Sequence, residues 1–239
     1  MATRTRRLAA TRMRAHTAQV FNPLPVPNQL EAVTVRDRVF RLIRPLDPAG
    51  LCDDEAVQRR FDADEYMPYW AELWPAALLL ASYLLDHPPE VEAAGALEIG
   101  CGLGLVGLAA AVAGFEVLAT DYDADAVRTA TRSAELTGVR GFRAAVMDWR
   151  RPALGRRFDR IFAADVLYER RWHGPIARLV AGCLTHNGEA LICDPGRAVA
   201  AGFTDQARIA GLTVQDDPVT GHDETGKPIR GVLYRLTHA

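Results

Sequence analysis

The stretch Ala96-Leu97-Glu98-Ile99-Gly100-Cys101-Gly102-Leu103-Gly104 decides the fold of this chain. A short apolar run leads into three glycines that alternate with larger residues, and the helix-like segment 105–113 follows at once. Glycines let the backbone approach a ligand closely, and the N-terminus of a helix favours a carboxylate or a phosphate. The stretch therefore predicts a strand, a ligand-binding loop and a helix in succession.

Downstream of this loop, short apolar runs alternate with amphipathic helical stretches, which is typical of a Rossmann-like, doubly wound α/β sheet with mostly parallel strands. The last two runs flank a loop rich in Gly and Asp with no room for a helix, so we expect them to form an antiparallel hairpin. The seven predicted strands cover residues 96–99, 115–120, 142–147, 158–164, 188–193, 212–219 and 229–236.

Three parts make up the chain in this interpretation. Residues 1–29 carry five arginines before the first acid and end in a proline-rich stretch, which predicts an extended segment. It is read as a tail, with a basic arm or a mitochondrial presequence as alternatives. Residues 30–67 predict an accessory hairpin and a short helix opened by Asp53-Asp54-Glu55. Residues 68–239 hold the domain with the glycine loop, preceded by a helix over 70–86.

Composition excludes several classes of function. The chain has 239 residues, of which 49% are hydrophobic, enough to bury the core of one large domain. Its net charge of -2 does not favour a nucleic-acid partner, and no apolar run approaches the roughly 20 residues that span a bilayer. The four cysteines form no C-x-x-C pair, so neither a disulfide framework nor a metal site is expected. We expect a cytoplasmic protein, or a mitochondrial matrix protein if the arginine-rich segment is a presequence. Lys227 is the only lysine.

The glycine loop and Asp121 together predict a nucleoside site. Asp121 ends the apolar run 117–119, where a carboxylate can accept hydrogen bonds from ribose hydroxyls. The segment 102–107 also fits the dinucleotide pattern G-x-G-x-x-G, so a dinucleotide-dependent oxidoreductase is one alternative. Three features favour S-adenosylmethionine (SAM): the helical segment ahead of the first core strand, the terminal hairpin, and Glu98. Glu98 would attract the cationic methionine end of SAM and would repel a pyrophosphate.

Over roughly residues 68–237 the chain resembles the class I SAM-dependent methyltransferases. The resemblance implies a sheet ordered 3-2-1-4-5-7-6 with strand 7 antiparallel. It also implies that the loop from Gly100 to Gly104 lies against the methionine part, that Asp121 binds the ribose and that the segment 147–149 flanks the adenine. Trp149 is alternatively a core aromatic. The residues expected around the cofactor are Trp74, Glu98, Gly100, Cys101, Gly102, Gly104, Asp121, Tyr122, Asp148, Trp149 and Ala164.

The segment Asp165-Val166-Leu167-Tyr168 emerges from the predicted strand 158–164 at its carboxyl end, where open α/β sheets bind ligands. The Asn- or Asp-Pro-Pro-aromatic motif of nucleic-acid amino methyltransferases is missing there. Asp165 and Tyr168 instead resemble the motif of the seven-strand protein lysine methyltransferases, including those that act on the electron-transfer flavoprotein beta subunit. The resemblance implies that Asp165 accepts a hydrogen bond from the amine and that Tyr168 orients it. Alternatively, Asp165 caps the next segment and Tyr168 packs on the sheet.

A second match lies ahead of the glycine loop. Pro68-Tyr69-Trp70-Ala71, with Trp74 and the segment 83–86, resembles the helix that precedes the core of the flavoprotein-directed enzymes, in which a tryptophan at the position of Trp74 borders the cofactor. The chain departs from that branch at Ala76-Ala77, where the branch has two glycines. It departs from other lysine methyltransferases at Pro75, where they carry an acid.

The predicted function is transfer of methyl groups from SAM to lysine in a protein substrate, with Asp165 and Tyr168 at the acceptor. A small-molecule amine N-methyltransferase and a catalytically silent scaffold remain alternatives. Two further places are open to interpretation. Arg197, in the turn 194–197, either touches the substrate or belongs to a plain turn. The acidic loop from Asp216 to Glu224 either attracts a basic peptide or is a solvated hairpin loop.

Overall fold

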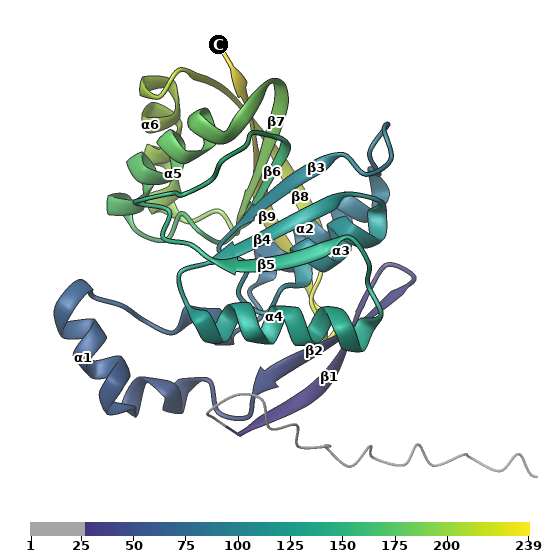
Figure 1. The fold of residues 1–239 in the computed structure, drawn as a ribbon, viewed down its shortest axis with the longest axis vertical. Coiled ribbons are helices and arrows are strands. Elements are labelled where there is room, and N and C mark those ends of the chain that lie inside the picture. Colours follow the sequence, from purple (N-terminus) through teal and green to yellow (C-terminus); the bar gives the residue numbers. More distant parts are fainter. Residues whose placement is uncertain (1–26) are drawn as a thin grey trace, which may run out of the picture.

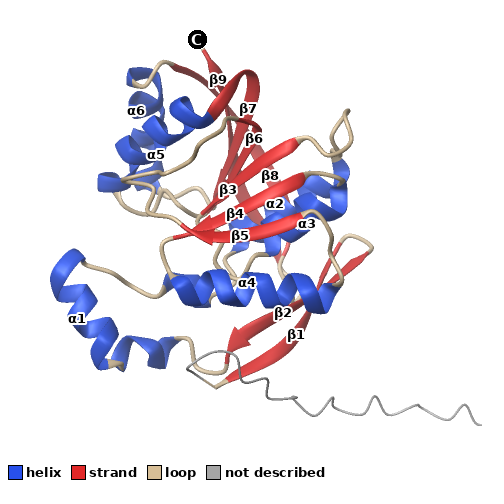
Figure 2. Ribbon diagram, viewed as in Figure 1, coloured by secondary structure: helices blue, strands red, loops and turns tan. Residues whose placement is uncertain are grey.

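The computed structural model describes residues 27–239. The segment predicted over 1–29 therefore lies outside the described residues as far as residue 26. A twisted sheet forms the middle of the molecule, helices cover both of its faces, and a small hairpin lies beneath one helix layer (Figure 1, Figure 2). No helix within residues 27–239 has the length and apolar character needed to cross a membrane.

Seven strands form the central sheet in the order β5-β4-β3-β6-β7-β9-β8. When the strands are renumbered along the chain with β3 as strand 1, this is the predicted order 3-2-1-4-5-7-6. Strand β9 runs antiparallel to both β7 and β8. The predicted fold class is confirmed. The strands are β3 (Gly95–Ile99), β4 (Glu116–Asp121), β5 (Phe142–Val146), β6 (Phe158–Ala164), β7 (Leu184–Asp194), β8 (Leu212–His222) and β9 (Pro228–His238).

The two faces of the sheet bury different helices because successive side chains of a strand point to opposite sides. Leu97 and Ile99 of β3 pack with α5 and α6, whereas Ala96 packs with α2 and α3. The parallel strands place their carboxyl ends at one edge of the sheet, and the functional residues follow those ends. The helices are α2 (Pro75–Asp86), α3 (Leu105–Ala113), α4 (Ala124–Thr137), α5 (Arg170–Cys183) and α6 (Phe203–Ile209), with a short 3-10 helix, η3 (Ala198–Gly202), before α6.

The predicted accessory hairpin consists of β1 (Asn28–Val35) and β2 (Arg38–Pro45). It packs on α4: the backbone N–H of Ile43 donates to the hydroxyl of Ser133 at 3.0 Å, and that of Arg41 donates to Thr137 at 2.9 Å. The buried side chains of Phe40 and Leu42 supply the apolar part of this contact. The hairpin thus extends the core on the α4 side of the sheet.

The short helix expected after Asp53 is α1 (Glu55–Asp64), preceded by a 3-10 turn, η1 (Ala49–Asp53). Asp54 caps α1 by accepting a hydrogen bond from the N–H of Ala56 at 2.7 Å. None of the helix residues is buried. The helix projects from the body of the molecule in Figure 1, so its position depends on the contacts at its C-terminal end.

The helix predicted over residues 70–86 is wrong at its start. Residues Tyr69–Ala71 form a separate 3-10 turn, η2, and α2 begins only at Pro75. The cause is Pro75, because a proline favours the first helical position and forces the residue before it out of helical geometry. Trp74 is accordingly extended, with φ -80° and ψ 145°, and stands at the N-terminus of α2.

The loop predicted from Asp216 to Glu224 is also wrong over most of its length. Strand β8 continues to His222, paired with β9 throughout, and only a tight turn over residues 223–227 joins the two. Strand β8 is an edge strand of the sheet, and its successive side chains point to opposite faces. Asp217 pairs with Arg235 of β9 at 3.0 Å. In the turn, the carboxylate of Asp223 accepts from the N–H of Lys227 at 2.9 Å, and Lys227 itself is exposed.

Candidate active site

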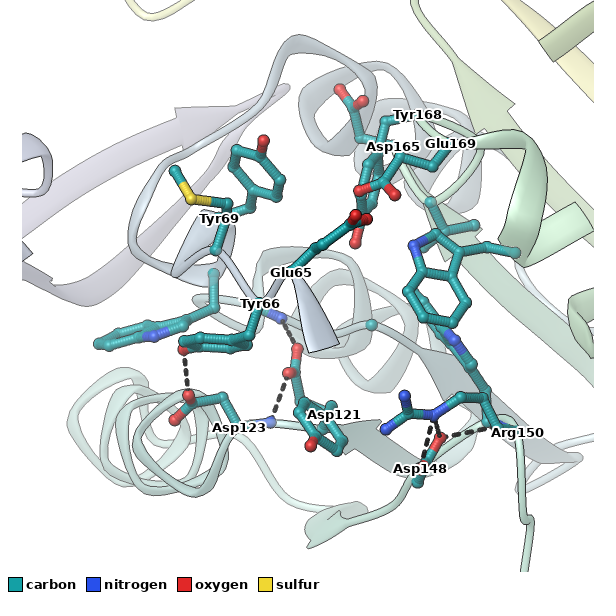
Figure 3. Close-up of a pocket in the computed structure, with 18 of the residues that line it drawn as sticks. Glu65, Tyr66, Tyr69, Asp121, Asp123, Asp148, Arg150, Asp165, Tyr168 and Glu169 are labelled. Atoms are coloured by element: carbon teal, nitrogen blue, oxygen red, sulfur yellow. Dashed lines mark hydrogen bonds and ion pairs between the residues drawn. The ribbon is translucent and has the colours of Figure 1, made fainter. Parts of the chain in front are cut away.

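A pocket opens where β3, β4 and β6 end (Figure 3). Residues that follow these strands form part of its wall, and residues between α1 and α2 form another part. Ten of the thirteen predicted site residues line it. They are Trp74, Gly100, Gly102, Asp121, Tyr122, Asp148, Trp149, Ala164, Asp165 and Tyr168.

The glycine loop needs glycine for two reasons. Gly100, Gly102 and Gly104 have φ values of 68°, 50° and 90°, which side chains rarely adopt. A Cβ at Gly100 would also lie 2.9 Å from Cγ1 of Val166, and one at Gly102 would lie 3.3 Å from the backbone oxygen of Trp70. The loop therefore brings bare backbone to the pocket wall, which allows a ligand to approach it closely.

Asp121 lies at the end of β4 with both carboxylate oxygens held by backbone amides. Gly102 donates to Oδ2 at 2.9 Å and Asp123 donates to Oδ1 at 2.9 Å (Figure 3). Burial raises the pKa of this carboxyl to about 6, although the amides oppose the shift. Each ionised oxygen keeps a further lone pair for a hydroxyl donor, so the site fits the ribose of SAM.

Glu98, Cys101 and Gly104 do not line the pocket. Glu98 lies beneath the loop against α3, where a Cβ on Gly107 would come within 2.3 Å of its Oε2. Burial raises the pKa of Glu98 well above its ordinary value, and Oε2 has no hydrogen-bond partner among the described residues. Cys101 is part of the apolar core, and Gly104 stands at the start of α3. Direct contact of these three residues with the cofactor stays a prediction.

Aromatic rings and an arginine form the wall expected at the adenine. The rings of Trp149 and Trp172 lie 5.8 Å apart, and the guanidinium of Arg150 lies 5.1 Å from the ring of Tyr122. Asp148 fixes Arg150 through a hydrogen bond of 2.8 Å. Trp149 lines the pocket and also packs against the core, so its core role is confirmed and its contact with the adenine stays a prediction. Flat rings of this kind suit a purine.

Asp165 and Tyr168 lie at the other end of the pocket, directly after β6. Asp165 is in the left-handed backbone region with φ 63°, and its N–H donates to the backbone oxygen of Cys193 at 2.8 Å. Tyr168 packs edge-on against Tyr69 at 5.2 Å, and Tyr69 in turn contacts Trp74 at 6.0 Å. Burial raises the pKa of the Tyr168 hydroxyl, which therefore stays protonated at neutral pH.

Sequence reasoning missed about half of the pocket wall. The missed residues come mostly from segments whose position depends on tertiary packing. The closely spaced aromatics between α1 and α2 were the one signal in the sequence that pointed to some of them. They are Asp64, Glu65, Tyr66, Met67, Tyr69, Trp70, Asp123, Arg150, Val166, Glu169, Arg171 and Trp172.

Comparison with known families is decisive. A family model described as "Lysine methyltransferase" matches residues 62–201, which is more than half of the chain and includes every residue that lines the pocket. The chain belongs to the lysine methyltransferase family. This membership favours SAM over a dinucleotide as the meaning of the glycine pattern. Among residues 27–239 no group of His, Cys, Asp and Glu side chains is arranged to hold a metal ion.

Curated relatives agree with the family. The electron transfer flavoprotein beta subunit lysine methyltransferase of Rattus norvegicus is 31% identical over 144 residues, which cover 59% of this chain and 56% of the rat protein. Its counterpart in Xenopus laevis is 30% identical and is covered to 68%, with 77% of this chain aligned. The chain spans about half the length of most of these relatives.

Solved structures confirm the fold. A TehB-like SAM-dependent methyltransferase from Corynebacterium glutamicum superposes with a TM-score of 0.53 at 20% identity, covering 80% of this chain and all of that protein. The [4+2]-cyclase SpnF superposes with a TM-score of 0.56 at 13% identity, covering 67% of this chain and 80% of that protein. The fold is therefore that of the SAM-dependent methyltransferases.

Proposed function

We propose that this protein transfers methyl groups from SAM to the side-chain nitrogen of lysine in a protein substrate. The observation that carries the proposal is that Asp165 and Tyr168 share one pocket with the glycine loop and Asp121. In this proposal the glycine loop and Asp121 form the cofactor half of the cavity, and Asp165 and Tyr168 form its acceptor half. Membership of the lysine methyltransferase family supports the same assignment.

The chemistry asked of the protein is mainly positioning. When bound, SAM supplies an activated methyl group, so that transfer forms the N–C bond, breaks the C–S bond and leaves the electron pair on sulfur. The lysine nitrogen must be a neutral amine, because its lone pair attacks the methyl carbon. Free lysine has a pKa of about 10.4 and is mostly protonated at neutral pH, so the site must favour the neutral form. In this proposal Asp165 accepts a hydrogen bond from the amine and stabilises the charge that develops on nitrogen. Tyr168, Tyr69 and Trp74 wall the alkyl chain and exclude water.

Several of the relatives are named for the beta subunit of electron transfer flavoprotein, which makes that protein the first acceptor to test. The purified chain would be incubated with labelled SAM and either this subunit or a cell lysate. Label in protein, located on lysine by mass spectrometry, supports the proposal. Label confined to the small-molecule fraction would instead support an amine N-methyltransferase.

The variant D165N separates an enzyme from a silent scaffold. Asn keeps the size of the side chain but removes the charge, so we expect turnover to fall by about 100-fold or more. S-adenosylhomocysteine (SAH) should still bind with nearly the wild-type affinity, because Asp121 and the glycine loop are unchanged. Equal turnover in D165N and the wild type would remove Asp165 from the mechanism.

A further inference from the structure

Arg197 reaches the predicted acceptor carboxylate from the neighbouring strand. Its Nη1 pairs with Oδ1 of Asp165 and lies 3.4 Å from Oδ2 of Asp194. The side chains of Asp165 and Asp194 are 3% and 0% exposed, while that of Arg197 is 29% exposed. The guanidinium therefore bridges two buried carboxylates and remains partly exposed.

The backbone fixes this bridge. Asp194 ends β7, and its Oδ1 accepts hydrogen bonds from the N–H groups of Gly196 and Arg197, both at 2.7 Å. Gly196, with φ 87°, supplies the left-handed turn that this arrangement requires. Since the N–H of Asp165 bonds to the oxygen of Cys193, the ends of β6 and β7 hold the two partners in register. The turn at 194–197 is thus a structured element of the site.

The bridge leaves Asp165 with one oxygen engaged and one free. Oδ2 of Asp165 is buried and has no hydrogen-bond partner among the described residues. A buried acceptor without a donor is costly, so this oxygen is prepared to receive a donor from a ligand. An N–H of the acceptor amine has the right chemistry to supply it.

Asp165 also lines a small cavity, which we call the acceptor slot. Three aromatic rings and Arg197 form its wall, and Cζ of Arg197 is 5.9 Å from the ring of Trp74. The slot suits an unbranched alkyl chain that ends in nitrogen. Its lining residues are Tyr69, Trp74, Asp165, Tyr168, Glu169 and Arg197.

Other charges around the slot are partly compensated. Glu169 pairs with Arg171, which also pairs with Glu65. The side chain of Glu65 is 68% exposed, so at the mouth these acids attract a protonated lysine. Asp165, the acid that meets the amine in this interpretation, likewise carries an arginine, Arg197.

A lone carboxylate would stabilise the ammonium form of lysine and raise the pKa of the amine, which opposes methyl transfer. A fixed cation beside the amine has the opposite effect and favours the neutral form. Arginine suits this task because its guanidinium stays charged at all physiological pH values. Asp194 is held in addition by two backbone N–H groups, which leaves the guanidinium to offset the charge of Asp165. The pairing therefore addresses the one chemical requirement that Asp165 alone would make worse.

We propose that Arg197 is a positioning residue that compensates the charge of Asp165, so that the acceptor slot takes a primary alkyl amine in its neutral form. The proton of the incoming ammonium passes to solvent, and an N–H of the amine donates to Oδ2 of Asp165. This inference rests on the proposed function, since it concerns the acceptor end of the same pocket. It adds Arg197 to the residues of the proposed site and specifies that the acceptor amine binds in its neutral form.

The test uses n-butylamine, the end of a lysine side chain, with the intact protein and SAH. Isothermal titration calorimetry in buffers of different ionisation enthalpy counts the protons released on binding. Wild type should release about one proton per amine at pH 8, and its affinity should rise about tenfold per pH unit from 7 to 9. R197Q should bind the ammonium form, with little proton release and little dependence on pH.

Two further variants and one further ligand sharpen the result. R208Q is the matched control, because Arg208 is exposed on α6, pairs with Asp205 and does not line the slot. It should behave as wild type. R197K keeps the charge but loses the planar geometry, so it should restore part of the proton release. Tetramethylammonium, which has no proton to lose, should bind R197Q more tightly than wild type.

Failure of this inference is distinct from failure of the proposed function. Wild type that binds n-butylamine without releasing a proton, or does not bind it, overturns the role of Arg197 whether or not the protein methylates lysine. Identical proton release in R197Q and wild type has the same meaning. Loss of SAH binding in wild type counts against the proposed function instead, and the amine titration can then be read without SAH.

Discussion

The hydroxyl group of Tyr66 donates a hydrogen bond to the carboxylate of Asp123, which joins the segment before α2 to the loop after β4. Arg60 of α1 pairs with the same carboxylate at 2.9 Å, and its guanidinium lies 3.4 Å from the centre of the Tyr66 ring. Since α1 has no buried residue, these polar contacts hold it beside the pocket. The helix is therefore attached to the pocket wall at Asp123 by charge and hydrogen bonding.

Replacing Arg60 should loosen this attachment. In R60Q the helix loses its ion pair with Asp123, at a cost of about 1 kcal/mol for a partly exposed pair. We expect roughly fivefold faster hydrogen exchange over residues 55–67 and faster dissociation of SAH. R59Q is the matched control, because Arg59 pairs only with Glu55 of the same helix. Equal exchange in the two variants would show that α1 is held by something else.

Asp121 should make SAH binding depend on pH. Its pKa of about 6 means that the carboxylate gains a proton as the pH falls below 6, and a protonated carboxyl has lost hydrogen-bond acceptors for the ribose. Affinity should therefore be constant above pH 7 and fall toward pH 5. D121N should bind SAH 10- to 100-fold more weakly and without this pH dependence. D125N, at a position that pairs with Arg128 in the first turn of α4 and does not line the pocket, should match wild type in both respects, as calorimetry can establish.

Glu98 should reduce stability as the pH rises. Its raised pKa means that the folded protein keeps a proton which the unfolded chain releases above about pH 4.5, so stability is lost with increasing pH through that range. E98Q does not have this loss. We expect it to be about 1–3 kcal/mol more stable than wild type at pH 7 and nearly equal at pH 4, by urea unfolding.

The same variant tests the role that the sequence predicts for Glu98 at the cofactor. Because the side chain lies beneath the loop and does not line the pocket, E98Q should keep its SAH affinity within about threefold of wild type. A tenfold loss would support direct contact with the methionine end.

Gly104 should tolerate no side chain. G104A combines a left-handed residue, with φ 90°, and a Cβ only 2.8 Å from that of Ala130. We expect a loss of about 2–4 kcal/mol of unfolding free energy. G138A is the control, since Gly138 has φ 76° but no atom within 4 Å of an added Cβ, and should lose about 1 kcal/mol. Similar midpoints in thermal unfolding would assign the whole effect to backbone strain.

Much of the fold follows from local pattern. The predicted strands agree with the sheet because alternation of apolar runs and amphipathic stretches is a local signal, and the order of the strands came from resemblance. The start of α2 was missed although a proline such as Pro75 favours the first position of a helix. The apolar residues on both sides of Pro75 resemble one continuous helix. The extent of β8 was missed because its acids, such as Asp216 and Asp217, resemble a loop until pairing with β9 is known.

The site residues likewise fall into those that the sequence marks and those that only tertiary contacts bring to the pocket. Asp121 and Asp165 were found because each follows a strand at its carboxyl end, a position that sequence can mark. Glu65 and Arg171 were not found, since they reach the pocket through tertiary contacts that have no sequence signature. For Arg197 the sequence left two interpretations open, contact with the substrate and a plain turn. Its pairing with Asp165 depends on β6 and β7 being neighbours, which is a property of the assembled sheet.

The tight turn between β8 and β9 exposes Lys227, the one lysine of the sequence. Cationic surface elsewhere in the chain is provided by arginine. Under the proposed function, this sequence offers a single lysine side chain as an acceptor of its own, so automethylation of lysine within it would be confined to position 227. In K227R that background disappears, and any radioactivity that reaches a lysine side chain then reports on other proteins alone.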